Sequence, residues 1–151
     1  MKRTTARLVH LSSWSVTLTG VLLFYALHLF EEEDEFGPIP HEWQSEFQGA
    51  HIATAVLFLV AFGSILSIHV VPKLRSKSRR GWLSGWPLFL GVLVAIPSGY
   101  LLQIVSDPDW LEGSRCTHLY SSGVMLVFYA LHQVNLRRKR RLKSKPAQAT
   151  T

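Results

Sequence analysis

Six of the seven histidines in this chain lie within long apolar stretches, where ionisable side chains are uncommon. Two histidines occur on each of three stretches, and a fourth apolar stretch has none. The pairs are His10 with His28, His51 with His69, and His118 with His132. Because imidazole binds zinc, copper, nickel and iron, the repeated pairing predicts a metal-containing cofactor.

The spacing within each pair returns the imidazole to nearly the same face of a helix. Two of the pairs are 18 residues apart, which is about 5.0 helical turns and ~27 Å of rise. The third pair is 14 residues apart, about 3.9 turns and ~21 Å. Each helix is therefore expected to present one histidine near each of its ends, as two cofactor layers across a membrane would require.

The elements that must position these histidines are four stretches of about 20 residues or more, bounded by charged segments. They cover residues 8–30, 47–71, 82–105 and 117–136. As helices, each is long enough to cross a hydrocarbon core of ~30 Å. The sequence therefore predicts a single all-α domain, an integral membrane four-helix bundle.

The distribution of charge predicts the orientation of that bundle. Fifteen of the sixteen Lys and Arg residues lie in the N-terminal segment, the middle loop and the basic tail, residues 137–151. All ten acidic residues and Arg115 lie in the other two loops. By the positive-inside rule both termini are cytoplasmic, in a multi-pass protein of the bacterial inner membrane. The tail is expected to contact anionic lipid and not nucleic acid.

The chemistry of the histidines favours haem over a bare metal ion. Zinc and copper sites usually recruit carboxylates or thiols, but here every acid lies in a loop. Axial ligation by imidazole in two layers suits haem iron. Because Cys116 is the only cysteine, no C-x-x-C-H attachment motif exists. Two non-covalent b haems are therefore expected.

The same residues also resemble a known family. The pattern H-x13-H from His118 to His132, R-x-x-H from Arg7 to His10, and His51 at the start of the second stretch look like the bacterial di-haem cytochromes b. That superfamily includes cytochrome b561 and the b-type subunits of hydrogenases and formate dehydrogenases. The resemblance implies electron transfer between quinone and a periplasmic partner. It further implies that His51 and His118 bind the outer haem, and that His10 and His132 bind the inner one.

Two further histidines, His28 and His69, depart from the family pattern and leave the inner haem open. His69 or His10 can pair with His132, and the sequence favours His69. It lies in SILSIHVV, which is expected to be buried, whereas His10 lies near a terminus that can fray. His28 is expected to be a supporting hydrogen-bond donor, part of a substrate pocket, or the outer ligand in place of His51.

The expected function is that of a membrane di-haem b-type cytochrome that transfers electrons across the bilayer between the quinone pool and a periplasmic carrier or catalytic subunit. The alternative is a cofactor-free membrane-anchor subunit of a larger redox complex.

Candidate polar contacts for quinone are Tyr100, Gln103, Gln133 and Asn135. The acidic run 31–35 is expected to be solvated or to dock a basic carrier. Pro97 and Gly99 are expected to kink or open the third helix, with Gly99 serving close helix packing or making room for a flat cofactor.

Overall fold

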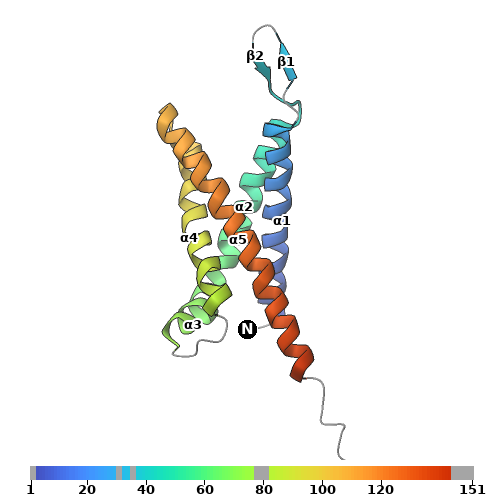
Figure 1. The fold of residues 1–151 in the computed structure, drawn as a ribbon, viewed down its shortest axis with the longest axis vertical. Coiled ribbons are helices and arrows are strands. Elements are labelled where there is room, and N and C mark those ends of the chain that lie inside the picture. The colour runs from blue at the N-terminus through green and yellow to red at the C-terminus, as the bar shows by residue number, and fades with distance from the viewer. Residues whose placement is uncertain (1–2, 30–31, 35–36, 77–81, 144–151) are drawn as a thin grey trace, which may run out of the picture. The chain divides into compact units, whose positions relative to one another are not determined.

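The structure is a computed structural model of the 151-residue chain, and it describes residues 3–29, 32–34, 37–76 and 82–143. The chain divides into two compact units, Met1–Ser76 and Lys77–Thr151. Each unit contains one pair of long helices that run antiparallel as a helical hairpin (Figure 1). We call the end of a hairpin where its two helices are connected the loop end, and the opposite end the open end.

In the first hairpin, α1 packs against α2, and a short antiparallel β-ribbon lies in the connection between them. The elements are α1 (Arg3–His28), β1 (Glu32–Asp34), β2 (Gly37–Ile39), α2 (Gln44–Ile65), the π-helical turn η1 (Leu66–Val70) and α3 (Val71–Arg75). The two predicted spans, 8–30 and 47–71, correspond to these helices, although α1 begins five residues earlier. Of the acidic run, residues 31 and 35 lie outside the described part of the chain.

Four of the six buried side chains among the described residues of the first hairpin are small, and the other two are Val16 and Phe58. Ser12, Ser13 and Ala26 of α1 are buried, and so is Ala61 of α2. The Ser13 hydroxyl donates to the carbonyl of its own helix at Val9 (2.7 Å), so burial leaves it hydrogen-bonded. In apolar surroundings helices associate through such small residues, because these allow the backbones to approach closely.

The π-helical turn η1 interrupts the second predicted span near its end. The backbone N–H of Val71 donates to the carbonyl of Leu66, five residues earlier and not four. Pro72 follows directly, and a proline lacks an N–H and crowds the carbonyl four residues before it. A turn with one extra residue rotates everything beyond it by roughly 100° relative to a continuous α-helix.

The second hairpin consists of α4 (Trp82–Ile104) packed against α5 (Pro108–Lys143). Both Pro87 and Pro97 lie inside α4, so the kink or opening expected at Pro97 does not end the helix. At Gly91 the two helices approach closely. A Cβ added there would lie 3.1 Å from the backbone nitrogen of Met125, so glycine is needed for this contact.

The segment predicted as a loop before the fourth span is helical, because α5 begins at Pro108 and not near residue 117. Asp107 explains the early start. Its carboxylate Oδ1 accepts hydrogen bonds from the backbone N–H groups of Asp109 and Trp110, both at 3.1 Å. An aspartate cap followed by proline at the first helical position is a strong helix start. The helix then continues into the predicted basic tail as far as Lys143, and residues 144–151 lie outside the described part.

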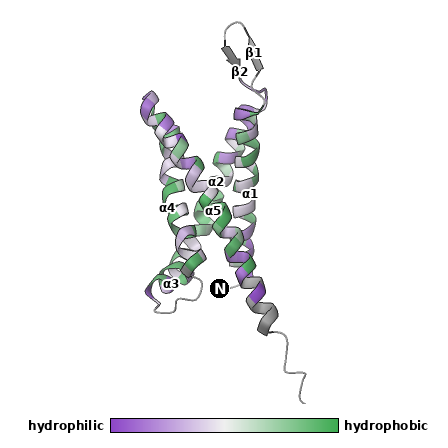
Figure 2. Cartoon of the chain, in the orientation of Figure 1, coloured by the Kyte–Doolittle hydropathy of each residue, from purple (hydrophilic) through white to green (hydrophobic). Residues whose placement is uncertain are grey.

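Three helical segments of the described chain are long and apolar enough to cross a membrane: Arg3–His28, Gln44–Arg75 and Leu83–Ile104. Figure 2 shows the apolar colouring along these helices. Large apolar side chains such as Leu18 and Val60 are more than 60% exposed, as lipid-facing residues are. The predicted fourth span, 117–136, lies within α5 and is interrupted by small polar residues and two histidines.

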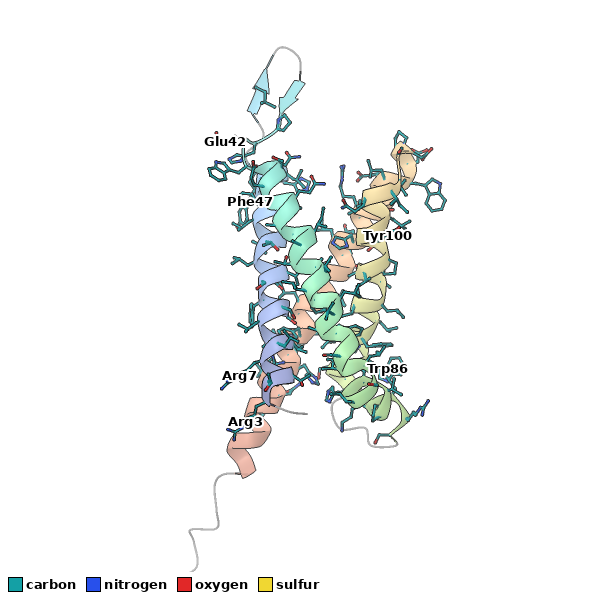
Figure 3. The ribbon with its side chains drawn as sticks, turned by 180° about the vertical axis from the view of Figure 1, so that it is seen from behind. Arg3, Arg7, Glu42, Phe47, Trp86 and Tyr100 are labelled. Atoms are coloured by element: carbon teal, nitrogen blue, oxygen red, sulfur yellow. The ribbon has the colours of Figure 1, made fainter. Side chains whose placement is uncertain are left out.

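Charged residues mark the two ends of the first hairpin. In Figure 3, Arg3 and Arg7 lie at the open end of α1, whereas Glu42 lies at the loop end, beside the start of α2. The basic and acidic segments recognised in the sequence are therefore separated along the length of this hairpin. This separation is what the positive-inside prediction requires of the first two helices.

Candidate functional site

His51 lies near the loop end of the first hairpin and is held by α1. Its Nδ1 is 3.2 Å from the hydroxyl oxygen of Thr19, which in turn lies 2.8 Å from the hydroxyl oxygen of Thr54. Gly20 makes room for the ring, because a Cβ added there would lie 2.9 Å from His51 Cε1. The imidazole is half-buried in this hairpin. One hydroxyl and one glycine of α1 therefore position the His51 ring.

His118 occupies a matching place in the second hairpin. Its Nδ1 lies 2.9 Å from the backbone carbonyl of Ala95 and 3.4 Å from the hydroxyl oxygen of Ser98. Because a carbonyl only accepts, Nδ1 carries the proton, and the neutral ring has its lone pair on Nε2. A Cβ added at Gly99 would lie 2.8 Å from His118 Cε1.

The structure shows a contact of Gly99 that the sequence did not suggest. Its missing side chain provides the space for the His118 ring. A glycine directly after a hydroxyl residue, at Thr19–Gly20 and again at Ser98–Gly99, is the signal that sequence reasoning missed.

His132 lies near the open end of the second hairpin. Its Nδ1 is 3.2 Å from the hydroxyl oxygen of Ser84, which is a buried residue of α4. His118 and His132 are both on α5, which is helical throughout Pro108–Lys143. The 14-residue spacing therefore keeps its predicted phase, and the two imidazoles lie on about the same face of α5.

His69 does not keep the phase that its spacing from His51 predicts. It lies inside η1, where the wider turn already moves it out of phase with His51. His69 is itself half-buried, as His10 is, although its neighbours Leu66 (37%) and Ile68 (56%) are exposed. Burial therefore does not distinguish the two histidines.

The other histidines have distinct surroundings. His10 is half-buried near the open end of α1. His28 is exposed at the last position of α1, with its ring centroid 4.7 Å from that of Phe24. His41 accepts a hydrogen bond from the backbone N–H of Trp43 (3.2 Å) in the connection before α2. Among the described residues, no group of three or more His, Cys, Asp or Glu side chains is arranged to hold a bare metal ion.

An open cleft of about 370 Å³ lies between α4 and the first turns of α5. Its lining includes Ser98, Asp109, Trp110 and Ser114. Within the described residues that lining does not include Tyr100 or Gln103, the two side chains suggested for quinone contact in this part of the chain. Tyr100 instead lies on the surface of the hairpin, 64% exposed.

Comparison of the chain with protein-family models, with curated proteins and with solved structures found no match.

Proposed function

We propose that this chain is a membrane di-haem b-type cytochrome that transfers electrons across the bilayer. The observation that carries the proposal is the hydrogen bond between His118 Nδ1 and the carbonyl of Ala95. An imidazole that binds a metal through Nε2 almost always donates its Nδ1–H to a carbonyl, carboxylate or water. His118 has this tautomer and this partner, and therefore fits the requirements of an axial haem ligand.

The outer haem is assigned to His51 and His118. Both histidines lie near the loop end of their hairpins, and both have Nδ1 within hydrogen-bond distance of a group on the neighbouring helix. These two neutral imidazoles would hold the haem iron without themselves adding a charge within the membrane. The assignment agrees with the family resemblance seen in the sequence.

The inner haem is assigned to His132 together with His10. His132 is held by Ser84 on the same helical face as His118. The sequence favoured His69 as the second ligand, but η1 rotates His69 away from the His51 face. His10 is the remaining histidine near the open end of the first hairpin, and it becomes the proposed partner, with His69 as the alternative.

When bound, b haems supply one-electron redox chemistry at iron. The residues of this chain hold the imidazoles, set their basicity through the Nδ1 hydrogen bonds and exclude water with the apolar faces of the helices. Two histidine layers about 20 Å apart, as the 14-residue spacing on α5 gives, would divide the crossing of the bilayer into shorter electron-transfer steps.

The remaining parts of the proposal concern surroundings and partners. The four predicted spans would insert in a bacterial inner membrane with both termini in the cytoplasm, which the separation of Arg3 and Arg7 from Glu42 supports. Quinone in the lipid phase and a periplasmic carrier or catalytic subunit are the proposed redox partners. A reporter fused after Thr151 should then read cytoplasmic, and one inserted at Gly37 periplasmic.

One measurement tests the central proposal. Protein purified in detergent should show a Soret band, a reduced-minus-oxidised α-band and two haems per chain by the pyridine haemochrome assay. Absence of both bands, after expression with added haem precursor, would contradict the cytochrome assignment. It would favour the membrane-anchor subunit, in which the histidine hydrogen bonds only hold the helices together.

A further inference from the structure

Three histidines of this chain are each reached by a hydroxyl group on the neighbouring helix, and in every case the hydroxyl residue directly precedes a glycine. The distances from the hydroxyl oxygen to histidine Nδ1 are 3.2, 3.4 and 3.2 Å. The sets are Thr19–Gly20 with His51, Ser98–Gly99 with His118, and Ser84–Gly85 with His132.

We infer that Thr19, Ser98 and Ser84 are positioning residues, each of which accepts the Nδ1–H of one haem-ligating histidine. By doing so, each hydroxyl fixes the rotation of the imidazole and raises the basicity of its Nε2. This inference rests on the proposed function, and it goes beyond it by assigning the control of each haem's potential to a particular hydroxyl.

The geometry restricts the His51 and His118 rings from two sides. On one side, the hydroxyl oxygen lies near Nδ1. On the other side, Cε1 of the ring occupies the space left by the glycine. A Cβ added at Gly20 would lie 2.9 Å from His51 Cε1, and one added at Gly99 would lie 2.8 Å from His118 Cε1. A ring turned about its side-chain torsions would lose the hydrogen bond or leave this space. Gly85 has no atom within 4 Å of an added Cβ, so at His132 the contact with the neighbouring helix is the Ser84 hydroxyl and not a glycine space.

The two outer histidines depend on their hydroxyls to different extents. The Nδ1–H of His118 has a second acceptor in the carbonyl of Ala95 at 2.9 Å, which is closer than Ser98 at 3.4 Å. Thr19 lies closer to its histidine, at 3.2 Å from His51 Nδ1, and its hydroxyl oxygen is 2.8 Å from that of Thr54. Loss of the Thr19 hydroxyl should therefore disturb its histidine more than loss of the Ser98 hydroxyl.

The first test measures the midpoint potential of each haem in purified variants. Thr19→Val should raise the potential of the outer haem, because a less basic imidazole stabilises ferric iron less, and should weaken haem retention by about tenfold. Ser98→Ala should raise the same potential by a smaller amount. Ser84→Ala should shift the inner haem and leave the outer one unchanged.

Two matched variants separate positioning from packing. Thr19→Ser keeps the hydroxyl and should restore the wild-type potential. Ser64→Ala removes a hydroxyl of α2 that hydrogen-bonds only the carbonyl of Ala61 in its own helix, and should leave both potentials unchanged. If Thr19→Val behaves like Ser64→Ala, or if Ser84→Ala shifts the outer haem, the assignment of these hydroxyls is wrong.

A second readout does not need haem. In haem-free protein labelled with ¹⁵N-histidine, NMR should show His51, His118 and His132 as neutral rings protonated on Nδ1. Thr19→Val should alter the His51 signals alone. Protonation of His51 and His132 on Nε2 would overturn the inference even if haem binds. Conversely, wild-type protein that binds no haem but has the expected tautomers would contradict only the proposed function.

Discussion

The loop ends of the two hairpins are built alike. Gly20 lies seventeen residues after the first residue of α1, and Gly99 lies seventeen residues after the first residue of α4. Each glycine follows a hydroxyl residue and makes room for a histidine of the second helix, His51 or His118. The sequences around the two sites differ, so the similarity is one of positions and residue types and not of extended sequence.

The open ends of the hairpins differ. Ser84 lies fifteen residues before Gly99 and hydrogen-bonds His132. Thr5 lies at the same distance before Gly20 and could take the equivalent place in the first hairpin. There, however, η1 rotates His69, while α5 continues without interruption past His132.

The difference shows how a histidine with the expected spacing can fall out of helical phase with its partner on the same helix. Pro72 follows η1, and the wider turn accommodates the crowding that a proline imposes. The same turn moves His69 out of phase. The proposed second haem layer would then use another histidine of the first hairpin, and π-helical turns are frequent at functional sites.

The largest expected effect is the loss of one whole haem when a ligand of the second hairpin is removed. If the chain binds two haems as proposed, His132→Ala should lower the haem content from two to one per chain and leave the outer haem's spectrum intact, because the proposed layers would lie about 20 Å apart. His28→Ala is the matched control. Both residues end an FYALH segment, yet His28 is exposed and should be dispensable. Loss of a haem in His28→Ala would instead place α1 at the outer site.

The second prediction tests the difference between the open ends directly. His10→Ala should remove the inner haem as His132→Ala does, whereas His69→Ala should retain two haems per chain by haemochrome assay. The reason is the rotation of His69 by η1. The opposite result would be two haems in His10→Ala and one in His69→Ala. It would mean that the membrane-embedded helix does not keep this turn, and that His69 is the second inner ligand, as the sequence favoured.

The third prediction tests the similarity of the loop ends. Gly20→Ala and Gly99→Ala should each displace a histidine ring, destabilise the hairpin by about 1–3 kcal/mol and reduce occupancy of the outer haem. Thermal unfolding and the α-band report the two effects. Gly91→Ala should destabilise the second hairpin through contact with the backbone of Met125 but leave the haem spectrum unchanged. Gly123→Ala, with no atom within 4 Å of the added Cβ, should do neither.

The smallest effect concerns the single cysteine, at the loop end of the second hairpin. Cys116 is exposed, and its Sγ donates a hydrogen bond to Glu112 Oε1 (3.4 Å), which raises the pKa of the thiol. Since the thiolate is the reactive form, labelling by a membrane-impermeant maleimide should be slow at neutral pH and accelerate as the pH rises. Glu112→Gln should lower the pKa and speed labelling at neutral pH. Labelling only from the cytoplasmic side would reverse the proposed topology.

The sequence by itself determined the helical architecture and the identity of the candidate ligands. Apolar runs of about 20 residues between charged segments predict long helices because a continuous apolar face must be buried in protein or lipid. The predicted spans all fall in helices, and three long apolar segments are present. The missed start of α5 was readable as well, since Asp107 and Pro108 form a standard helix cap.

Only the tertiary structure decided how the histidines are held. Helical periodicity assumes 3.6 residues per turn throughout, so it placed His51 and His69 on one face and had no means of including η1. Similarly, the hydrogen bond of His118 to Ala95 and the space left by Gly99 join residues of two different helices. Such contacts depend on the rotation and separation of packed helices, which are set by side chains along the whole hairpin and not by the local sequence.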